Sequence, residues 1–400
     1  MTPPASGEDD VTAEGPAPGP SMRRSVTVCC VTELAELREH ATAWDALAQQ
    51  APERMPMLSH AWVSAFLETR LPPTKVWRCF LAYRSGALVG VLPVVRARSV
   101  PRGYWRSPVD SHTSCGHPLL AASSADEALA RLLDAVQGVE PGLLGARFYG
   151  VRDCSPVLSG SYGEGGLRVS SPRTSRGSFL ETSGSYAEFE AGLTRNFRRN
   201  LRKAGNRATR DHRVVWESVR GAQAGRPEIL QEFLDLESSG WKGDRGTAIS
   251  NSPALTRFYT VLAARLADRG WLEWQRLTFD GRLVASHLAI RLGRAVVLPK
   301  IAHDESHGRL GPGNLLMQET ISQAFADDGV DEVNCLTDMP WHRNWEMAQA
   351  DYRDLLLVPR GPLPLVASAR ESALPRALAR GVVSRFPGLL PTLTRLRHRG

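Results

Sequence analysis

The chain has 400 residues, of which 42% are hydrophobic and 23% are charged, and its formal net charge is +7. This composition suits a globular protein of two or three domains and excludes collagen-like or broadly disordered chains. The six cysteines contain no C-x-x-C motif, which argues against a disulfide framework and a zinc site, so we expect free thiols, no metal and a cytoplasmic location.

The two ends of the chain differ in composition from the rest. Residues 1–24 are rich in proline, glycine and acidic residues and lack the apolar stretch of a signal peptide, which predicts a disordered tail. Residues 359–400 contain eight arginines and one glutamate, so this basic C-terminal extension accounts for the whole net charge. Prolines interrupt its apolar residues, and two interpretations stay open: contact with an anionic membrane or RNA, or packing on the body. No apolar run reaches 18 residues, and we expect no transmembrane helix.

Between these ends the predicted elements follow the same order twice. Each copy has a strand, two helices, a hairpin, a helix and a further strand, with the hairpin turns at Ser85-Gly86 and Asp280-Gly281. Both hairpins continue as Gly-x-Leu-Val. A glycine- and serine-rich loop at 160–166 separates the copies. The sequence therefore predicts an α/β protein with mixed sheets, built from two copies of one unit at 25–165 and 166–358.

The most informative stretch, residues 282–325, lies in the second copy. Two apolar runs are followed by a polar loop and by Gly311-Pro312-Gly313-Asn314 at the start of a predicted helix. The first N–H groups of a helix lack intrahelical partners and favour anions, and glycines let a phosphate approach the backbone. Arg309 adds a cation to this loop. An ordinary strand-to-helix turn would contain the same glycines, and only the second copy has the loop.

A predicted helix at 193–213 is strongly basic. Its cations oppose only Asp211 and are Arg195, Arg198, Arg199, Arg202, Lys203, Arg207, Arg210 and Arg213. Such a helix can bind the phosphate of an anionic ligand or tRNA, or it can simply present a solvated face.

An ordered set of motifs resembles the GNAT-type acyltransferases of the BioF-two-like or CelD-like group, which are relatives of Fem-type aminoacyl ligases. The resemblance spans about residues 28–358. Its main motifs are Arg198-Arg199-Asn200-Leu201-Arg202-Lys203-Ala204, Gly240-Trp241-Lys242-Gly243, Asp280-Gly281, Lys300-Ile301-Ala302-His303-Asp304, Gly311-Pro312-Gly313, and Asp338 with Trp341-His342 and Trp345.

The resemblance implies tandem GNAT-like domains, an N-terminal one at 25–165 and an acyl-donor-binding one at 166–358. It also implies transfer of an acyl group, with acetyl as the first choice, from acyl-CoA to the amine of a small molecule or glycan. The family holds the CoA diphosphate on a Q/R-x-x-G-x-G/A loop. Here the window begins with Gly308 in place of Gln or Arg, and the donor-binding candidates are Arg309, Gly311, Gly313 and Asn314.

Acyl transfer to an amine needs a proton acceptor, a polarised carbonyl and correct alignment. The catalytic candidates are Lys300, His303, Asp304 and Asp338, with Lys300 near the oxyanion or a phosphate and Asp304 as the proton acceptor. The acceptor-binding candidates are Trp241, Lys242, Trp341 and His342. We interpret His287, in the middle of an apolar run, as a core histidine. Although His303 and His307 flank two acidic residues, no third ligand supports a metal.

Two other functions stay open. A Fem-type transferase would take its donor from aminoacyl-tRNA, as the basic helix and the basic extension would allow. A degenerate, non-catalytic relative would serve as a partner in polysaccharide biosynthesis or export.

Overall fold

The computed structural model of the protein describes residues 25–97, 104–140, 145–160, 162, 166–240 and 246–359. The predicted tail at 1–24, the extension beyond Pro359, and the candidates Trp241 and Lys242 lie outside these residues. None of the helices in the described ranges is long and apolar enough to cross a membrane.

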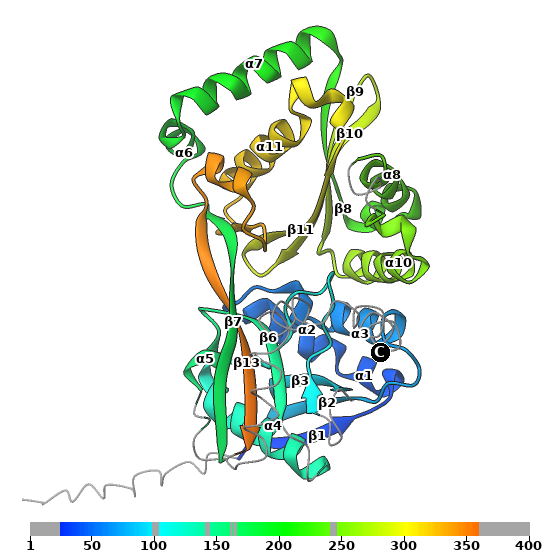
Figure 1. The fold of residues 1–400 in the computed structure, drawn as a ribbon, viewed down its shortest axis with the longest axis vertical. Helices are drawn as coiled ribbons and strands as arrows, with labels where there is room; N and C mark the ends of the chain where they lie inside the picture. Colours follow the sequence, from blue (N-terminus) through cyan, green and yellow to red (C-terminus); the bar gives the residue numbers. More distant parts are fainter. Residues whose placement is uncertain are drawn as a thin grey trace, which may run out of the picture.

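The first half begins with a strand and three helices that precede a hairpin (Figure 1). Its elements are β1 (Thr27–Val31), α1 (Leu34–Glu39), α2 (Ala41–Gln50), α3 (His60–Thr69), β2 (Trp77–Arg84), β3 (Ala87–Ala97), β4 (Tyr104–Arg106), β5 (Leu119–Leu120), α4 (Ala125–Val139), β6 (Ala146–Arg152) and α5 (Pro156–Ser159). The long strand β7 (Leu167–Glu181) then leads into the second half.

The second half repeats this order and adds two helices at its start. Its elements are α6 (Tyr186–Gly192), α7 (Arg195–Asp211), β8 (Val214–Arg220), α8 (Pro227–Ser238), α10 (Pro253–Asp268), β9 (Leu272–Phe279), β10 (Arg282–Leu292), β11 (Ala295–His303), the 3-10 helix η5 (Glu305–Leu310), α11 (Pro312–Ala326), β12 (Glu332–Asn334), the 3-10 helix η6 (Pro340–Trp345) and β13 (Ala348–Pro359).

The two predicted hairpin turns have the same backbone conformation. Ser85 and Gly86 have φ values of 51° and 83°, and Asp280 and Gly281 have 52° and 85°. Two successive residues with positive φ form the type I′ turn that matches the twist of a hairpin, and glycine or aspartate accommodates it at low cost. The predicted repeat and the mixed α/β fold class are therefore confirmed.

The strands of the described residues join one mixed sheet in the order β1-β2-β3-β4-β6-β13-β7-β12-β11-β10-β9-β8, with β5 on β3. β13, the last strand of the second half, lies beside β6 of the first half, and β7, which connects the halves, lies beside β12. The strands β7 and β13 also pair with each other along most of their length (Figure 1). The sequence predicts only a short strand at 178–181, whereas the observed strand starts at Leu167. The division of the chain at residue 165 stays a prediction.

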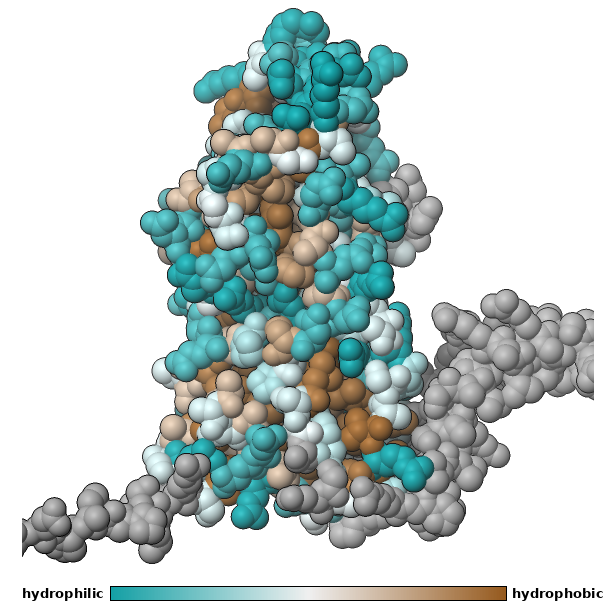
Figure 2. Space-filling model, turned by 90° about the vertical axis from the view of Figure 1, so that its left-hand side faces the viewer, coloured by the Kyte–Doolittle hydropathy of each residue, from teal (hydrophilic) through white to brown (hydrophobic). Residues whose placement is uncertain are grey.

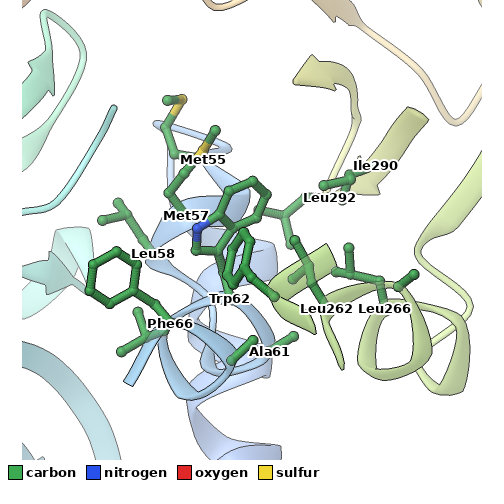
Figure 3. Packing of buried hydrophobic residues seen from close by; sticks show 14 of the residues in the cluster. Met55, Met57, Leu58, Ala61, Trp62, Phe66, Leu262, Leu266, Ile290 and Leu292 are labelled. Carbon is green, nitrogen blue, oxygen red and sulfur yellow. The ribbon is translucent and has the colours of Figure 1, made fainter. Parts of the chain in front are cut away.

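A shared hydrophobic core joins the halves. The rings of Trp62 on α3 and Phe258 on α10 form an edge-to-face pair with centroids 5.7 Å apart. Figure 3 shows Trp62 in this core, with Leu262 and Leu266 of α10 packed toward it. Burying such side chains supplies most of the favourable free energy of folding, so the two halves form one packed body.

Candidate functional site

The site forms where two parallel strands of the second half separate. β11 pairs with β12 only from Ala295 to Val297. β11 continues for six more residues, while β12 ends at Asn334 and is followed by Leu336 with a φ of 61°. From Leu298 onward, β11 therefore has no paired strand on this side among the described residues.

One cavity lies between this part of β11 and the start of α11. It has a volume of about 310 Å³, and we call it the donor cavity. Its lining comprises His287, Ile301, Ala302, His303, Gly308, Gly311, Pro312, Gly313, Asn314, Met317 and Trp341. The predicted glycine-rich loop thus forms one wall, although Arg309 is not part of the lining.

The start of α11 offers backbone donors to the donor cavity. Gly311 takes the left-handed conformation, with φ 58°, and caps the helix without a side-chain bond. Pro312 has no N–H, and the first intrahelical bond is from Leu315 N to Gly311 O. The N–H groups of Gly313 and Asn314 therefore remain for a ligand at the positive end of the helix dipole. Phosphate oxygens fit such a helix start.

A second cavity, the inter-half cavity, has a volume of about 560 Å³ and is lined by both halves. The first half contributes Met57, Ser111, His112 and Ser114. The second half contributes Leu236, Glu237, Gly240, Leu298, Pro299, Lys300, Ile301, Ala302, His303, Glu305, Cys335, Leu336, Thr337, Met339, Trp341 and His342. The two cavities share Ile301, Ala302, His303 and Trp341, so a group held in one lies next to a group held in the other.

His303 lies in the wall that the cavities share. A Cβ atom on Gly313 would be 3.3 Å from His303 Nδ1, so the imidazole packs against the start of α11. The next residue, Asp304, donates its N–H to Val284 O of β10 at 2.8 Å. Because strand residues alternate in direction, the backbone groups of Ile301 and His303 point away from β10, toward the gap beside β12.

His287 is buried below the donor cavity, as the sequence interpretation of a core histidine requires. Its Nδ1 is 3.3 Å from Gln275 Oε1 and 3.2 Å from Thr320 Oγ1. The amide nitrogen of Gln275 donates to Glu273 at 3.1 Å, which directs Oε1 toward the imidazole. Burial lowers the pKa of His287 to about 3, so its ring is neutral near pH 7.

This network fixes the tautomer of His287. Since Gln275 Oε1 can only accept, Nδ1 carries the proton and Nε2 has a free lone pair. Within the described residues, Nε2 makes no hydrogen bond and is not completely buried. His287 also lines the donor cavity. The imidazole therefore offers that cavity a fixed, uncharged acceptor.

Asp304 lies outside the linings of both cavities. Its carboxylate caps η5 by accepting from Ser306 N at 2.9 Å and Ser306 Oγ at 2.6 Å, and it pairs with Arg282 at 3.0 Å. Burial opposes ionisation, but the hydrogen bonds from Ser306 and the nearby charges outweigh it and lower the pKa of Asp304. These contacts occupy the carboxylate and indicate that it holds the loop at 305–314, which we call the donor loop.

The remaining second-half candidates lie on or near the inter-half cavity. Lys300 lines it, with Nζ 5.9 Å from the centre of the Tyr259 ring. Trp341 and His342 line it with their rings edge to face at 4.1 Å, and burial lowers the pKa of His342 despite the opposing charge of Asp338. Asp338 is not in the lining, and its buried Oδ1 has no partner in the described part of the chain.

Sequence reasoning missed two residues of this cavity. His112 comes from a loop of the first half, where Asp110 Oδ1 accepts from His112 N at 2.8 Å, and its Nδ1 lies 3.1 Å from Tyr259 Oη. Burial and the charge of Lys300 lower the pKa of His112 to about 4. Glu237, on α8, is buried and accepts from Ile249 N at 2.9 Å. Neither residue lies in a local motif; only the three-dimensional contact between the halves reveals them.

The basic helix α7 packs beside the donor loop. Leu201 and Ala208 are buried, whereas Arg199, Arg202, Lys203 and Arg207 are exposed. Gly205 approaches Leu315 at the start of α11, and His212 lies 5.9 Å from the His307 ring of η5. Figure 2 shows a hydrophilic cap at the end of the molecule where Figure 1 places α7.

Comparisons with known proteins agree with this architecture. Residues 195–343 match the family described as acetyltransferase (GNAT) domain. This segment includes α7, β8 to β12 and both cavity walls on β11, so it forms a GNAT-type acyltransferase domain and confirms the predicted class of enzyme. No curated protein matches the chain in sequence.

Several solved structures share the fold. FemX is 12% identical, with a TM-score of 0.57, over 79% of this chain and 95% of its own. A conserved protein of unknown function from Bacteroides thetaiotaomicron is 13% identical, with a TM-score of 0.52, over 81% and 97%. The C-terminal domain of a putative lysylphosphatidylglycerol synthetase from Agrobacterium fabrum is 15% identical, with a TM-score of 0.50, over 86% and 99%. The fold is thus that of the Fem-related GNAT group, as the sequence resemblance implies.

Proposed function

We propose that the protein transfers an acyl group, acetyl in the first instance, from acyl-CoA to an amine. The observation that carries this proposal is the shared wall of two cavities at the point where β11 leaves β12. In this proposal the donor cavity holds acyl-CoA and the inter-half cavity holds the amine. The transferred carbonyl would lie at the shared wall, beside His303 and Trp341.

The residues present fit a CoA ester. The free N–H groups of Gly313 and Asn314 suit the diphosphate. The free edge of β11 suits the amide groups of the pantetheine arm, which can pair with it as an added strand would. A backbone N–H of Ile301 or His303 directed at the gap can polarise the thioester carbonyl. A cytoplasmic location is part of the proposal, since acyl-CoA and reduced thiols are found there.

Groups in the inter-half cavity would accept the proton that the amine loses. His303 borders both cavities, so its imidazole can reach an amine that attacks across the shared wall. Lys300 would stabilise negative charge near the carbonyl or hold the acceptor. We place Asp304 and Asp338 in positioning roles, because neither is in the lining.

Calorimetric titration of the full chain with CoA and acetyl-CoA tests the proposal. We expect binding that is lost in Gly313→Val, whose side chain would project beside His303 at the wall. Replacing Gly192, at the exposed end of α6 with nothing within 4 Å of its Cβ position, gives the matched control Gly192→Val. The absence of any CoA binding to folded wild-type protein would overturn the proposal.

A second candidate donor is aminoacyl-tRNA, and one observation favours it. The exposed cations of α7 extend along a helix of 17 residues beside the donor loop. This positive surface is larger than the single 3′-phosphate of CoA requires. For tRNA we expect binding that weakens steeply with salt and is lost in Lys203→Glu/Arg207→Glu. For CoA we expect a small salt effect and little change in this variant. Electrophoretic and calorimetric titrations of the same preparations separate the two donors.

A further inference from the structure

The first half contributes one imidazole to the inter-half cavity. We propose that His112 binds the ligand of this cavity by donating a hydrogen bond from its Nε2–H group to an oxygen of that ligand. This inference rests on the proposed function and extends it, because it makes the first half part of the acceptor site. It gives His112 the role of a fixed hydrogen-bond donor and not that of a proton acceptor.

The loop that carries His112 is held on both sides of this residue. Asp110 Oδ1 accepts from His112 N at 2.8 Å and from Thr113 N at 2.9 Å, so one carboxylate oxygen shapes the turn. The other oxygen, Oδ2, accepts from Arg70 Nε at 2.9 Å. Thr113 is buried, and its Oγ1 accepts from Trp62 Nε1 on α3 at 3.0 Å. These contacts attach the loop to the first half and limit the positions that the imidazole can take.

Tyr259 of α10 fixes the imidazole from the second half. Its Oη lies 3.1 Å from His112 Nδ1, and the two rings are edge to face with centroids 5.8 Å apart. Burial raises the pKa of the Tyr259 hydroxyl well above its usual value, so the oxygen keeps its proton. Within the described residues, His112 Nδ1 is the only hydrogen-bond partner of this hydroxyl. The phenol therefore donates to Nδ1, because a buried O–H group is costly without an acceptor.

An imidazole that accepts at Nδ1 carries its proton at Nε2. A neutral histidine has one N–H group and one ring lone pair, and the Tyr259 hydroxyl occupies the lone pair of Nδ1. Burial and the charge of Lys300 lower the pKa of His112 to about 4, although the carboxylates of Asp110 and Glu237 act in the opposite direction. The ring therefore binds no second proton near pH 7, and Nε2–H is an uncharged donor.

The Nε2–H group is the part of His112 that remains for a ligand. Among the described residues, Nε2 makes no hydrogen bond and is not completely buried. His112 lines the inter-half cavity but not the donor cavity, so this group serves the molecule that the proposed function places in the inter-half cavity. Since an N–H group only donates, the complementary ligand atom has a lone pair. An ether, hydroxyl, carbonyl or carboxylate oxygen provides one.

Nitrogen NMR of the full chain labelled with ¹⁵N-histidine tests the tautomer directly. The chain has ten histidines, and the resonances of His112 are those that disappear in His112→Gln. Near pH 7 we expect a neutral ring with the proton on Nε2 in the wild type. In folded Tyr259→Phe, we expect the proton to divide between the two ring nitrogens. A proton on Nδ1 in the wild type, or an unchanged spectrum in Tyr259→Phe, would overturn the inference.

Amine pairs that differ by one oxygen test the contact with the ligand. The probes are 2-methoxyethylamine with butylamine and 3-methoxypropylamine with pentylamine, each titrated by calorimetry into protein saturated with CoA. An ether oxygen replaces a methylene group in each pair, so the ratio of the two affinities reports a hydrogen bond to that oxygen. We expect His112→Phe to lower this ratio about two- to tenfold in at least one pair. We expect His112→Gln, which keeps an N–H donor, to retain part of the ratio.

A second histidine–tyrosine pair provides the matched control. His40 Nδ1 lies 2.7 Å from Tyr83 Oη, and neither residue lines either cavity. We expect His40→Phe to leave the affinity ratios unchanged, and each variant to bind CoA alone as tightly as the wild type does. Equal ratios in the wild type and His112→Phe, or no binding of any of the four amines, would overturn the inference. CoA binding by itself still decides the proposed function, so the two failures are distinguishable.

Discussion

Arg152 and Glu332 form a bidentate ion pair that links the halves. The guanidinium nitrogens lie 2.8 and 2.9 Å from the two carboxylate oxygens, and both side chains are almost fully buried. Arg152 ends β6 of the first half, and Glu332 starts β12 of the second. Asn334 donates to Glu332 Oε1 at 2.7 Å, so the carboxylate has further support. Because β12 is the strand from which β11 diverges, this pair also anchors one side of the site.

Breaking this pair on one side leaves a buried charge without its partner. We expect Arg152→Ala to lower the free energy of unfolding by about 3–5 kcal/mol. Chemical denaturation of the full chain measures this change. The control is the exposed pair of Arg176 and Asp351 between β7 and β13, 3.6 Å apart, for which Arg176→Ala should cost less than about 1 kcal/mol. Equal losses in the two variants would contradict the structural role given to Arg152.

Local patterns in the sequence predict much of the fold. The hairpin turns, the basic helix and the glycine-rich loop all follow from residues close in the chain, and each is present in the structure. The pairing of β7 with β13 does not follow, because these strands are about 180 residues apart along the chain. A short pattern cannot indicate with which of two similar strands a given strand will pair.

Local patterns likewise indicate only part of the candidate site. Gly311, Gly313, Asn314 and His303 lie in one local stretch, and the structure brings them together at the donor cavity. His112 reaches the inter-half cavity only because the two halves pack against each other. Asp304 lies in the predicted stretch, but its carboxylate caps η5, and local spacing cannot show the direction of a side chain.

The stability of the protein should fall as the pH is lowered through the range in which unfolded histidines gain protons. Burial lowers the pKa of His60, His112 and His117 to about 4 and that of His287 to about 3, from an ordinary value of 6.5. Between these values the unfolded chain binds more protons than the folded one, so stability rises with pH there and is lost as the pH drops.

One of these histidines can be removed to test the linkage. His117 is buried, with Nδ1 2.9 Å from Pro118 O. We expect His117→Asn to reduce the slope of unfolding free energy against pH, between pH 5 and 6, by up to about 1.4 kcal/mol per pH unit. Denaturation midpoints of both proteins across this range give the slopes. Identical slopes would show that His117 takes up its proton at the same pH in the folded protein as in the unfolded chain.

The glycine-rich loop can be tested for its conformation apart from its ligand. Gly311 has a φ of 58° and nothing within 4 Å of its Cβ position, so Gly311→Ala meets backbone strain but no steric clash. We expect it to destabilise the protein by about 1 kcal/mol and to weaken CoA binding less than tenfold. Thermal denaturation and calorimetry on the same samples compare the two effects. A stability equal to that of the wild type would contradict the left-handed conformation.

His287 should position the donor without transferring a proton. Its Nδ1–H is held by Gln275, and its Nε2 offers a lone pair to the donor cavity. Removing one such hydrogen bond costs about 0.5–1.5 kcal/mol, so we expect His287→Phe to raise the KM for acyl-CoA about two- to tenfold while the turnover rate stays within twofold. His287→Asn, which keeps a polar side chain, should recover part of the affinity. Since the folded imidazole has a pKa of about 3, it should give no break in the pH profile of turnover between pH 5 and 8. If both variants instead lost turnover by about two orders of magnitude, together with a titration near neutral pH, His287 would be a general base.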